Sequence, residues 1–112
     1  MPRAAPTRYR ILVTPEAEGD LRNASSYIRR GSHRAARVWL KGARQRIKTL
    51  AQHPDRCNLA PESAAFDEPI RELFYGSGNR GTYRILFAVI GKTVSVLHVR
   101  HGAMLPLKPD EP

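Results

Sequence analysis

Two long runs of β-branched, aliphatic and aromatic residues, joined by the dipeptide Gly91-Lys92, constrain the fold of this chain more than any other feature. The runs extend from Tyr83 to Ile90 and from Thr93 to Arg100, and their composition is typical of β-strands. A two-residue connection with glycine in first place favours a type II′ turn, because that position requires a positive φ. The sequence therefore predicts an antiparallel hairpin in which Ile90 pairs with Thr93.

The pairing of Ile90 with Thr93 also predicts which side chains share a face, because directly opposed residues lie on the same side of a sheet. The first face would carry Tyr83, Ile85, Phe87 and Val89 with Arg100, His98, Val96 and Val94. The second face would carry Arg84, Leu86, Ala88 and Ile90 with Val99, Leu97, Ser95 and Thr93, and with His101 diagonal to Arg84.

Helix signals occupy the first half of the chain. Thr14 is suited to cap a helix that starts at Pro15, and apolar residues recur on one side of this helix until Gly31 can close it. Ser32 begins a second amphipathic helix, which Pro54 must stop. Because the link between them is so short, we expect the two helices to form an antiparallel hairpin.

Two shorter strand patterns complete the series of elements, one from Tyr9 to Val13 and one from Pro69 to Tyr75. We expect an irregular surface connection over residues 55–68 and a flexible turn over residues 76–81. The order β-α-α-β-β-β predicts an α+β fold. In it an N-terminal strand and an antiparallel helical hairpin precede a three-strand antiparallel meander, which completes a four-stranded sheet.

The length of 112 residues favours a single domain, with a core over about 8–105 and flexible termini at 1–7 and 106–112. Cys57 is the only cysteine, which excludes an internal disulfide and fits the reducing cytoplasm. No run is long and apolar enough for a membrane helix, so we expect a soluble cytoplasmic protein. No cofactor is indicated, because the sequence has neither a phosphate-binding glycine loop nor residues at metal-ligand spacing.

One face of the expected sheet has no obvious cover. Two helices in one hairpin can cover only one side of a four-stranded sheet, and the larger rings favour the first face. Leu86, Leu97 and Val99 would then remain on the open side, edged by Arg84. An exposed apolar patch with charge at its edge is typical of a partner-binding site. The alternative is that the connection at 55–68 folds over this face.

Positive charge is concentrated in the helical segment. The chain has 19 Lys and Arg against 10 Asp and Glu, a net charge of +9, and no acidic residue lies between Asp20 and Asp55. On the second helix the cations fall away from the apolar stripe, and they are Arg34, Arg37, Lys41, Arg44 and Lys48. Such a surface indicates an acidic protein or a nucleic acid as partner, and the alternative is a solvated helix face.

Several motifs in this order resemble the RelE/ParE superfamily of small bacterial toxins, over about Tyr9 to Leu105. They are Ala35-Ala36 with Trp39, Ile47, Leu50 and His53-Pro54, then Arg71-Glu72-Leu73, Tyr83-Arg84-Ile85-Leu86-Phe87 and Val96-Leu97-His98-Val99-Arg100-His101-Gly102-Ala103. The resemblance, ParE-like more than RelE-like, implies the toxin of a type II toxin–antitoxin module of the plasmid-stabilisation type. A small acidic antitoxin would neutralise it in a hetero-oligomer.

The two branches of this superfamily differ in target. In the ParE-like branch the toxin inhibits DNA gyrase, and in the RelE-like branch it enters the ribosome and cuts messenger RNA. A metal-independent endoribonuclease needs a cation for the scissile phosphate, with acid and base groups beside it. For that alternative the resemblance implies Arg84 at the phosphate and His101 or Tyr83 as acid or base.

Three positions depart from the nuclease pattern. Ile70 and Glu72 stand on a strand where basic residues are expected, and Met104 stands in the tail where an arginine is frequent. Structural roles also compete with catalysis. Arg84 can form an internal salt bridge, for example to Glu72, and a strand histidine such as His101 is more often packed than catalytic.

The first hypothesis is therefore a ParE-like binding protein that inhibits gyrase, and the second is a ribosome-dependent endoribonuclease. A third is a plain nucleic-acid-binding module, for which the basic helical segment would serve although aromatic stacking groups are scarce. The residues expected to contact an antitoxin or a target are Arg71, Arg84, Leu86, Leu97, Val99, Arg100 and His101.

Overall fold

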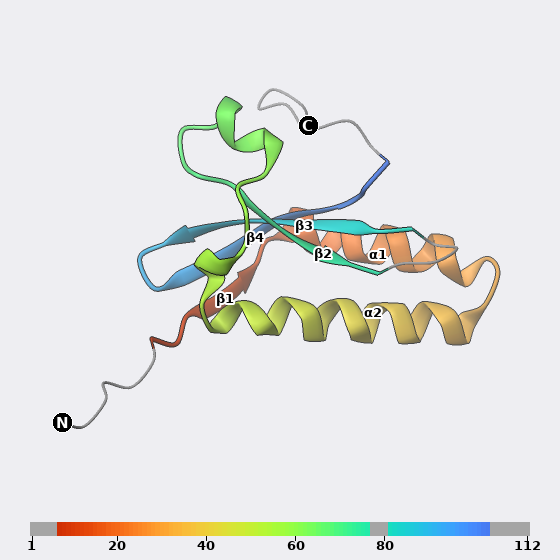
Figure 1. Ribbon diagram of the computed structural model, residues 1–112. Helices are drawn as coiled ribbons and strands as arrows, with labels where there is room; N and C mark the ends of the chain where they lie inside the picture. The colour runs from red at the N-terminus through yellow and green to blue at the C-terminus, as the bar shows by residue number, and fades with distance from the viewer. Residues whose placement is uncertain (1–6, 77–80, 104–112) are drawn as a thin grey trace.

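The fold is a four-stranded sheet with two helices on one side, seen in a computed structural model that describes residues 7–76 and 81–103 (Figure 1). The helices and strands are β1 (Arg10–Val13), α1 (Pro15–Arg29), α2 (His33–Lys48), β2 (Arg71–Tyr75), β3 (Tyr83–Ile90) and β4 (Thr93–His101). Three short 3₁₀ helices lie between α2 and β2, namely η1 (Thr49–Ala51), η2 (Pro54–Arg56) and η3 (Pro61–Ala65). The predicted element order and the α+β class are confirmed.

The strand order in the sheet is β1-β4-β3-β2. β1 runs parallel to β4, whereas β2, β3 and β4 form the predicted antiparallel meander. Apart from Thr7, Gly76 and Gly81, the termini and the turn that we expected to be flexible lie outside the described residues. Over the two described ranges, no helix combines the length and the apolar character that crossing a membrane requires.

Both long helices begin at the predicted caps. Thr14 Oγ1 accepts a hydrogen bond from Ala17 N at 3.2 Å, and Ser32 Oγ accepts one from Ala35 N at 3.1 Å. The buried stripes consist of Ala17, Leu21 and Ile28 in α1 and of Ala36, Trp39, Ala43 and Ile47 in α2. These stripes turn the helical hairpin towards the sheet.

The turn between β3 and β4 agrees with the predicted type II′ geometry. Gly91 has a φ of +60°, and among the described residues other than glycine only His53 has a positive φ, so Lys92 has none. Ile90 pairs with Thr93, and the predicted register holds as far as the pair of Phe87 with Val96.

Beyond Phe87 the predicted register is wrong, because the ladder has a β-bulge between Leu86 and Phe87. Leu97 is the extra residue of β4 at this point. The pairs that follow are Leu86 with His98, Ile85 with Val99, Arg84 with Arg100 and Tyr83 with His101. A slip of one residue reverses the face of each later side chain. Val99 and His101 therefore lie on the first face instead of the second, and Arg100 lies on the second.

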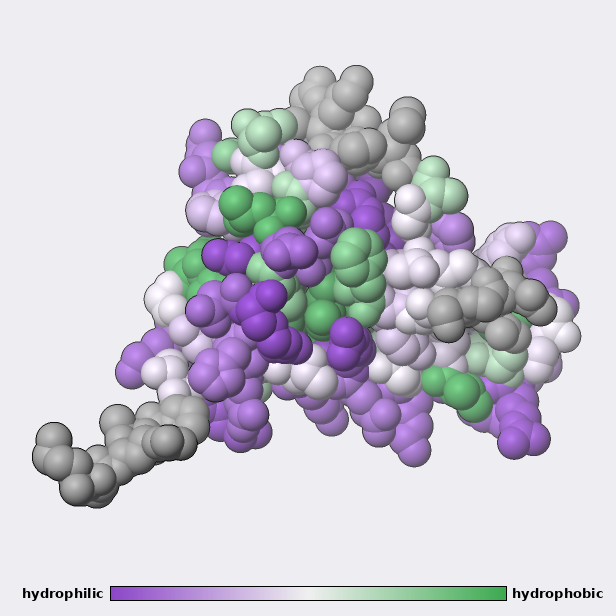
Figure 2. All heavy atoms as spheres, viewed as in Figure 1, coloured by the Kyte–Doolittle hydropathy of each residue, from purple (hydrophilic) through white to green (hydrophobic). Residues whose placement is uncertain are grey.

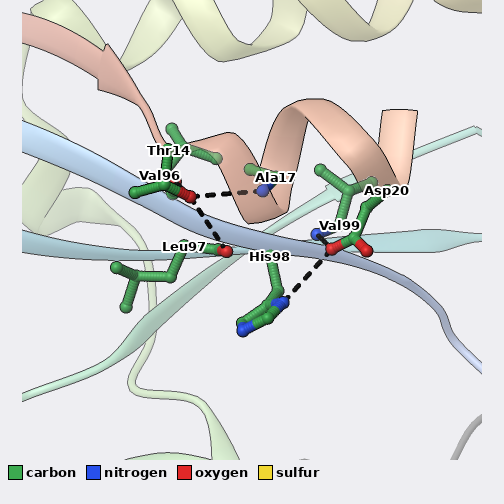
Figure 3. A network of polar contacts seen from close by, with 7 residues as sticks. All are labelled: Thr14, Ala17, Asp20, Val96, Leu97, His98 and Val99. Atoms are coloured by element: carbon green, nitrogen blue, oxygen red, sulfur yellow. Dashed lines mark hydrogen bonds and ion pairs between the residues drawn. The ribbon is translucent and has the colours of Figure 1, made fainter. Parts of the chain in front are cut away.

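Groups at the start of α1 hold the bulge in place (Figure 3). Thr14 Oγ1 lies 2.8 Å from Val96 O and 3.2 Å from Leu97 O, and it donates to these carbonyls. Asp20 Oδ2 accepts a hydrogen bond from Val99 N at 2.9 Å. The pairing of β1 with β4 ends at Val96. Polar groups of α1 therefore replace a neighbouring strand along the part of β4 where the bulge lies.

The first face of the sheet carries the main core, as predicted. Tyr83, Ile85, Phe87, Val94 and Val96 are buried there together with the helix stripes. Val99 joins them, which corrects its expected place on the open face. The bulge is the cause, because it turns Val99 towards α1.

The centre of the second face is also covered, so the prediction of an open apolar patch around Leu86 is wrong and the alternative, a connection folded over it, is right. Away from this centre, Leu12, Phe74 and Ile90 lie on the same face and are half or more exposed. Ala60, Ile70, Leu86 and Ala88 form a buried cluster, with Phe66 and Leu97 packed against it. We call residues 58–66, which include η3, the cover segment. It stands on the side of the sheet opposite α2 (Figure 1). Leu86 is only 1% exposed as a result.

Candidate functional site

Arg84 is the residue with the strongest functional expectation, and the structure encloses it under the cover segment. It extends from β3 on the second face and is 7% exposed. Nη2 lies 2.6 Å from Glu62 Oε2 and Nη1 lies 3.0 Å from Glu62 Oε1, which makes a bidentate ion pair. Nη1 also donates to Glu72 Oε1 at 3.1 Å. The alternative interpretation, an internal salt bridge to Glu72, is confirmed, and Glu62 is a second partner that the sequence did not indicate.

The two carboxylates keep Arg84 charged and occupied. Its hydrogen bonds to Glu62 are the largest cause of a raised pKa of Arg84, and those to Glu72 add to it, against the effect of burial. An incoming phosphate would have to displace a bidentate carboxylate and would meet two negative charges. The arrangement is therefore suited to fastening the cover segment and not to receiving an anion.

Two backbone hydrogen bonds and one to a serine hydroxyl attach the cover segment to β2 and to the residue before it. Ala60 N donates to Ile70 O at 2.8 Å, and Ile70 N donates to Ser63 Oγ at 3.0 Å. Glu72 N donates to Asn58 O at 3.0 Å. The cover segment is thus bound along the sheet edge by its backbone and over the sheet by the Glu62 carboxylate.

His101 and Tyr83 lie together on the first face, apart from Arg84. Their ring centroids are 5.1 Å apart in an edge-on contact. The ring of Trp39 from α2 also makes an edge-on contact with Tyr83, with 4.9 Å between the centroids. Burial raises the pKa of Tyr83. Ala103 N donates to His101 Nδ1 at 3.1 Å. We expected His101 to lie diagonal to Arg84 on the second face. This prediction is wrong, because the bulge places His101 on the opposite side of the sheet.

The ring contacts continue through Trp39 to β2. Tyr75 lies 5.8 Å from Trp39 and donates its hydroxyl to Trp39 O at 2.9 Å. Gly42 permits this approach, because a Cβ at that position would overlap the Tyr75 hydroxyl. Periodicity predicted that Trp39 is buried but not that three further rings line up with it. These contacts join α2 to the edge of the sheet.

The remaining residues of the predicted binding set occupy several environments. Arg71 is half-buried and donates to Cys57 O at 2.6 Å. Arg100 is half-buried and lies on the second face, where it is directly opposite Arg84 in the register of β3 and β4. Leu97 is half-buried against the cover segment. None of the seven residues in the set is fully exposed, and they do not form one surface. Their part in binding stays a prediction.

The basic surface of α2 has the expected placement. Arg34, Arg37, Lys41 and Lys48 are exposed, whereas Arg44 makes two hydrogen bonds to Glu18 at 2.9 and 3.0 Å. The pair lowers the pKa of Glu18 and raises that of Arg44. Hydrophilic residues dominate the lower edge of the molecule in Figure 2, where α2 runs.

The fold defines a class of protein. A helical hairpin packs on one face of a four-stranded sheet with the order found here, which is the α+β fold of the RelE/ParE-like proteins. Within that class, the model of the ParE toxin of the type II toxin–antitoxin system, parDE, matches residues 11–106. The chain belongs to this family, as the resemblance predicted.

A solved structure supports the fold assignment. It is described as the chromosomal ParDE TA system from P. aeruginosa, and one of its chains superposes on this chain with a TM-score of 0.64 and 20% sequence identity. The match covers 85% of this chain and 97% of that chain. A search of curated proteins gives no match.

Proposed function

We propose that this ParE-family chain is a toxin that binds and inhibits DNA gyrase, and that a cognate antitoxin neutralises it. Family membership supports a toxin of a type II toxin–antitoxin system. The gyrase target follows from the resemblance to the ParE-like branch. A toxin that acts by occupying a macromolecular target needs no group that makes or breaks a covalent bond. This agrees with the role of Arg84, whose hydrogen bonds to Glu62 and Glu72 stabilise the fold.

The observation that carries this proposal against the ribonuclease alternative is the enclosure of Arg84. Glu62 and Glu72 already take its hydrogen bonds, and the cover segment lies over it. The acid and base implied for a nuclease, Tyr83 and His101, lie on the other face of the sheet. Several groups must converge on one phosphate for RNA cleavage. Here they are separated by the thickness of the sheet.

An antitoxin partner has two kinds of support. The solved structure with the same fold is described as a ParDE TA system. The net charge of +9 also favours an acidic partner, because complementary charge speeds association and selects among partners. We expect the complex to be a hetero-oligomer.

The test compares two activities of the same purified full-length chain. We expect it to abolish supercoiling of relaxed plasmid by purified gyrase in a dose-dependent way. We expect messages translated in its presence to remain intact by primer extension. Codon-dependent cuts with unaffected supercoiling would overturn the proposal in favour of the endoribonuclease. Co-purification with the product of the neighbouring reading frame, and loss of inhibition on its addition, test the antitoxin.

A further inference from the structure

The outer side of the helical hairpin contains a basic groove. It has a volume of about 400 Å³ and lies between α1 and α2, with the buried Ala36 among its lining residues. We call it the hairpin groove. Its polar lining consists of Arg22, Ser25, Ser26 and Arg29 from α1 and His33 and Arg37 from α2.

Within the described residues, the arginines of the hairpin groove form no ion pair, unlike Arg44 and Arg84. Arg22, Arg29 and Arg37 are exposed, and none of them forms an ion pair with a described residue. Glu18 lies beyond one end of the groove, where Arg44 engages both of its oxygens. The hydrogen bonds from Arg44 are the largest cause of the lowered pKa of Glu18 and Arg22 adds to it, but no described acidic residue lines the groove, so the groove keeps a net positive charge.

The chemistry of the lining favours phosphate over an acidic protein segment. Guanidinium groups and serine hydroxyls donate hydrogen bonds, and the arginine fork matches the oxygens of phosphate and of carboxylate alike, so the choice between the two depends on the apolar lining. A protein partner usually needs an apolar pocket for an anchoring side chain. The apolar residues at the groove are Ala36, which is buried, and Leu40, which is half-buried, so among the described residues no large apolar one with a fully exposed side chain lines it.

We propose that the hairpin groove binds the phosphodiester backbone of duplex DNA without sequence preference. Arg22 and Arg29 are two helical turns apart, which is about 10 Å along the axis of α1. Each strand of duplex DNA carries one phosphate charge in about 3.4 Å of helix axis, so about three phosphates of one strand lie within that length. Arg37 adds a third cation from α2 across the groove. This inference does not depend on gyrase, because it concerns DNA alone.

The test measures fluorescence anisotropy of a labelled duplex of about 20 base pairs with the purified full-length chain, from about 50 to 200 mM KCl. The groove variant carries Arg22→Gln, Arg29→Gln and Arg37→Gln. We expect it to bind at least tenfold more weakly at the lowest salt concentration. The slope of log K against log salt should fall in magnitude by about 2 to 3, because each lost phosphate contact contributes about 0.9.

A control variant with Arg10→Gln, Lys48→Gln and Lys92→Gln removes the same charge from exposed positions outside the groove. We expect it to retain affinity within about threefold, and circular dichroism should show that both variants fold. Equal losses in the two variants would overturn the proposal, because binding would then depend only on net charge. It would also be overturned if the duplex does not bind while a poly-glutamate peptide does, which would assign the groove to an acidic protein.

Discussion

The two faces of the sheet are closed in different ways. The first face is closed by aliphatic and aromatic side chains that α1 and α2 press onto β3 and β4. The second face has only a small apolar cluster. The cover segment is held over it by ion pairs, in which Arg84 lies between Glu62 and Glu72. Apolar burial is additive and tolerant of small shifts, whereas a buried ion pair depends on both partners being present. Changes on the first face should therefore alter the stability of the whole domain. Changes on the second face should mainly alter the stability of the cover segment and of β2.

The largest expected effect comes from the first face. Phe87 is fully buried beneath the helices, so Phe87→Ala should lower the free energy of unfolding by about 3 to 5 kcal/mol. The matched change on the second face is Leu86→Ala, which removes a residue that is equally buried. We expect a loss of about 2 to 3 kcal/mol there, because the cover segment can settle into the vacated space. Denaturant titration measures both, together with Ile85→Ala, which removes a fully buried first-face residue of the same size as leucine. A loss for Leu86→Ala as large as that for Ile85→Ala would break the comparison.

Periodicity explains why the first face was predictable. The caps at Thr14 and Ser32, the helix stripes and the turn at Gly91 are local patterns, and each fixes an element without reference to distant residues. The resulting helical hairpin has one apolar side, which must face the sheet. The core around Phe87 follows from these local rules.

The second face could not be predicted in the same way, because its contacts are non-local and its cover has no period. Glu62 stands in an irregular, proline-containing segment, and nothing in the spacing of residues 55–68 shows that it reaches Arg84. The positive charge of Arg84 indicated that an acidic residue would pair with it. Among the strand residues, however, the sequence suggested only Glu72. The bulge at Leu97 also lacks a sequence signal, since it depends on polar groups that α1 brings to β4.

The second prediction tests whether the cover segment is a local unit. Glu62→Gln removes the bidentate partner of Arg84 and leaves Glu72, so we expect a loss of about 1.5 to 3 kcal/mol. Hydrogen exchange should accelerate over residues 58–66 and in β2, while the amides of β4 keep their protection. Glu68→Gln, at an exposed position in the same connection, is the control and should change neither. Acceleration spread evenly over the whole sheet would show that the two faces unfold together.

The smallest effect concerns the bulge that assigns Val99 to the first face. Thr14 and Ser32 both cap helices, but only Thr14 also donates to carbonyls of β4. Ser32→Ala should therefore cost about 1 kcal/mol, the usual value for a lost cap, and Thr14→Ala about 1 kcal/mol more. In the Thr14 variant alone, the amide of Val99 should exchange faster, because the hydroxyl contacts to Val96 O and Leu97 O are lost and only the backbone N–H of residue 14 and the Asp20 carboxylate still hold the bulge. Equal losses in stability and unchanged exchange at Val99 would mean that the strand keeps its bulge unaided, and that the register of β4 is set by its own packing.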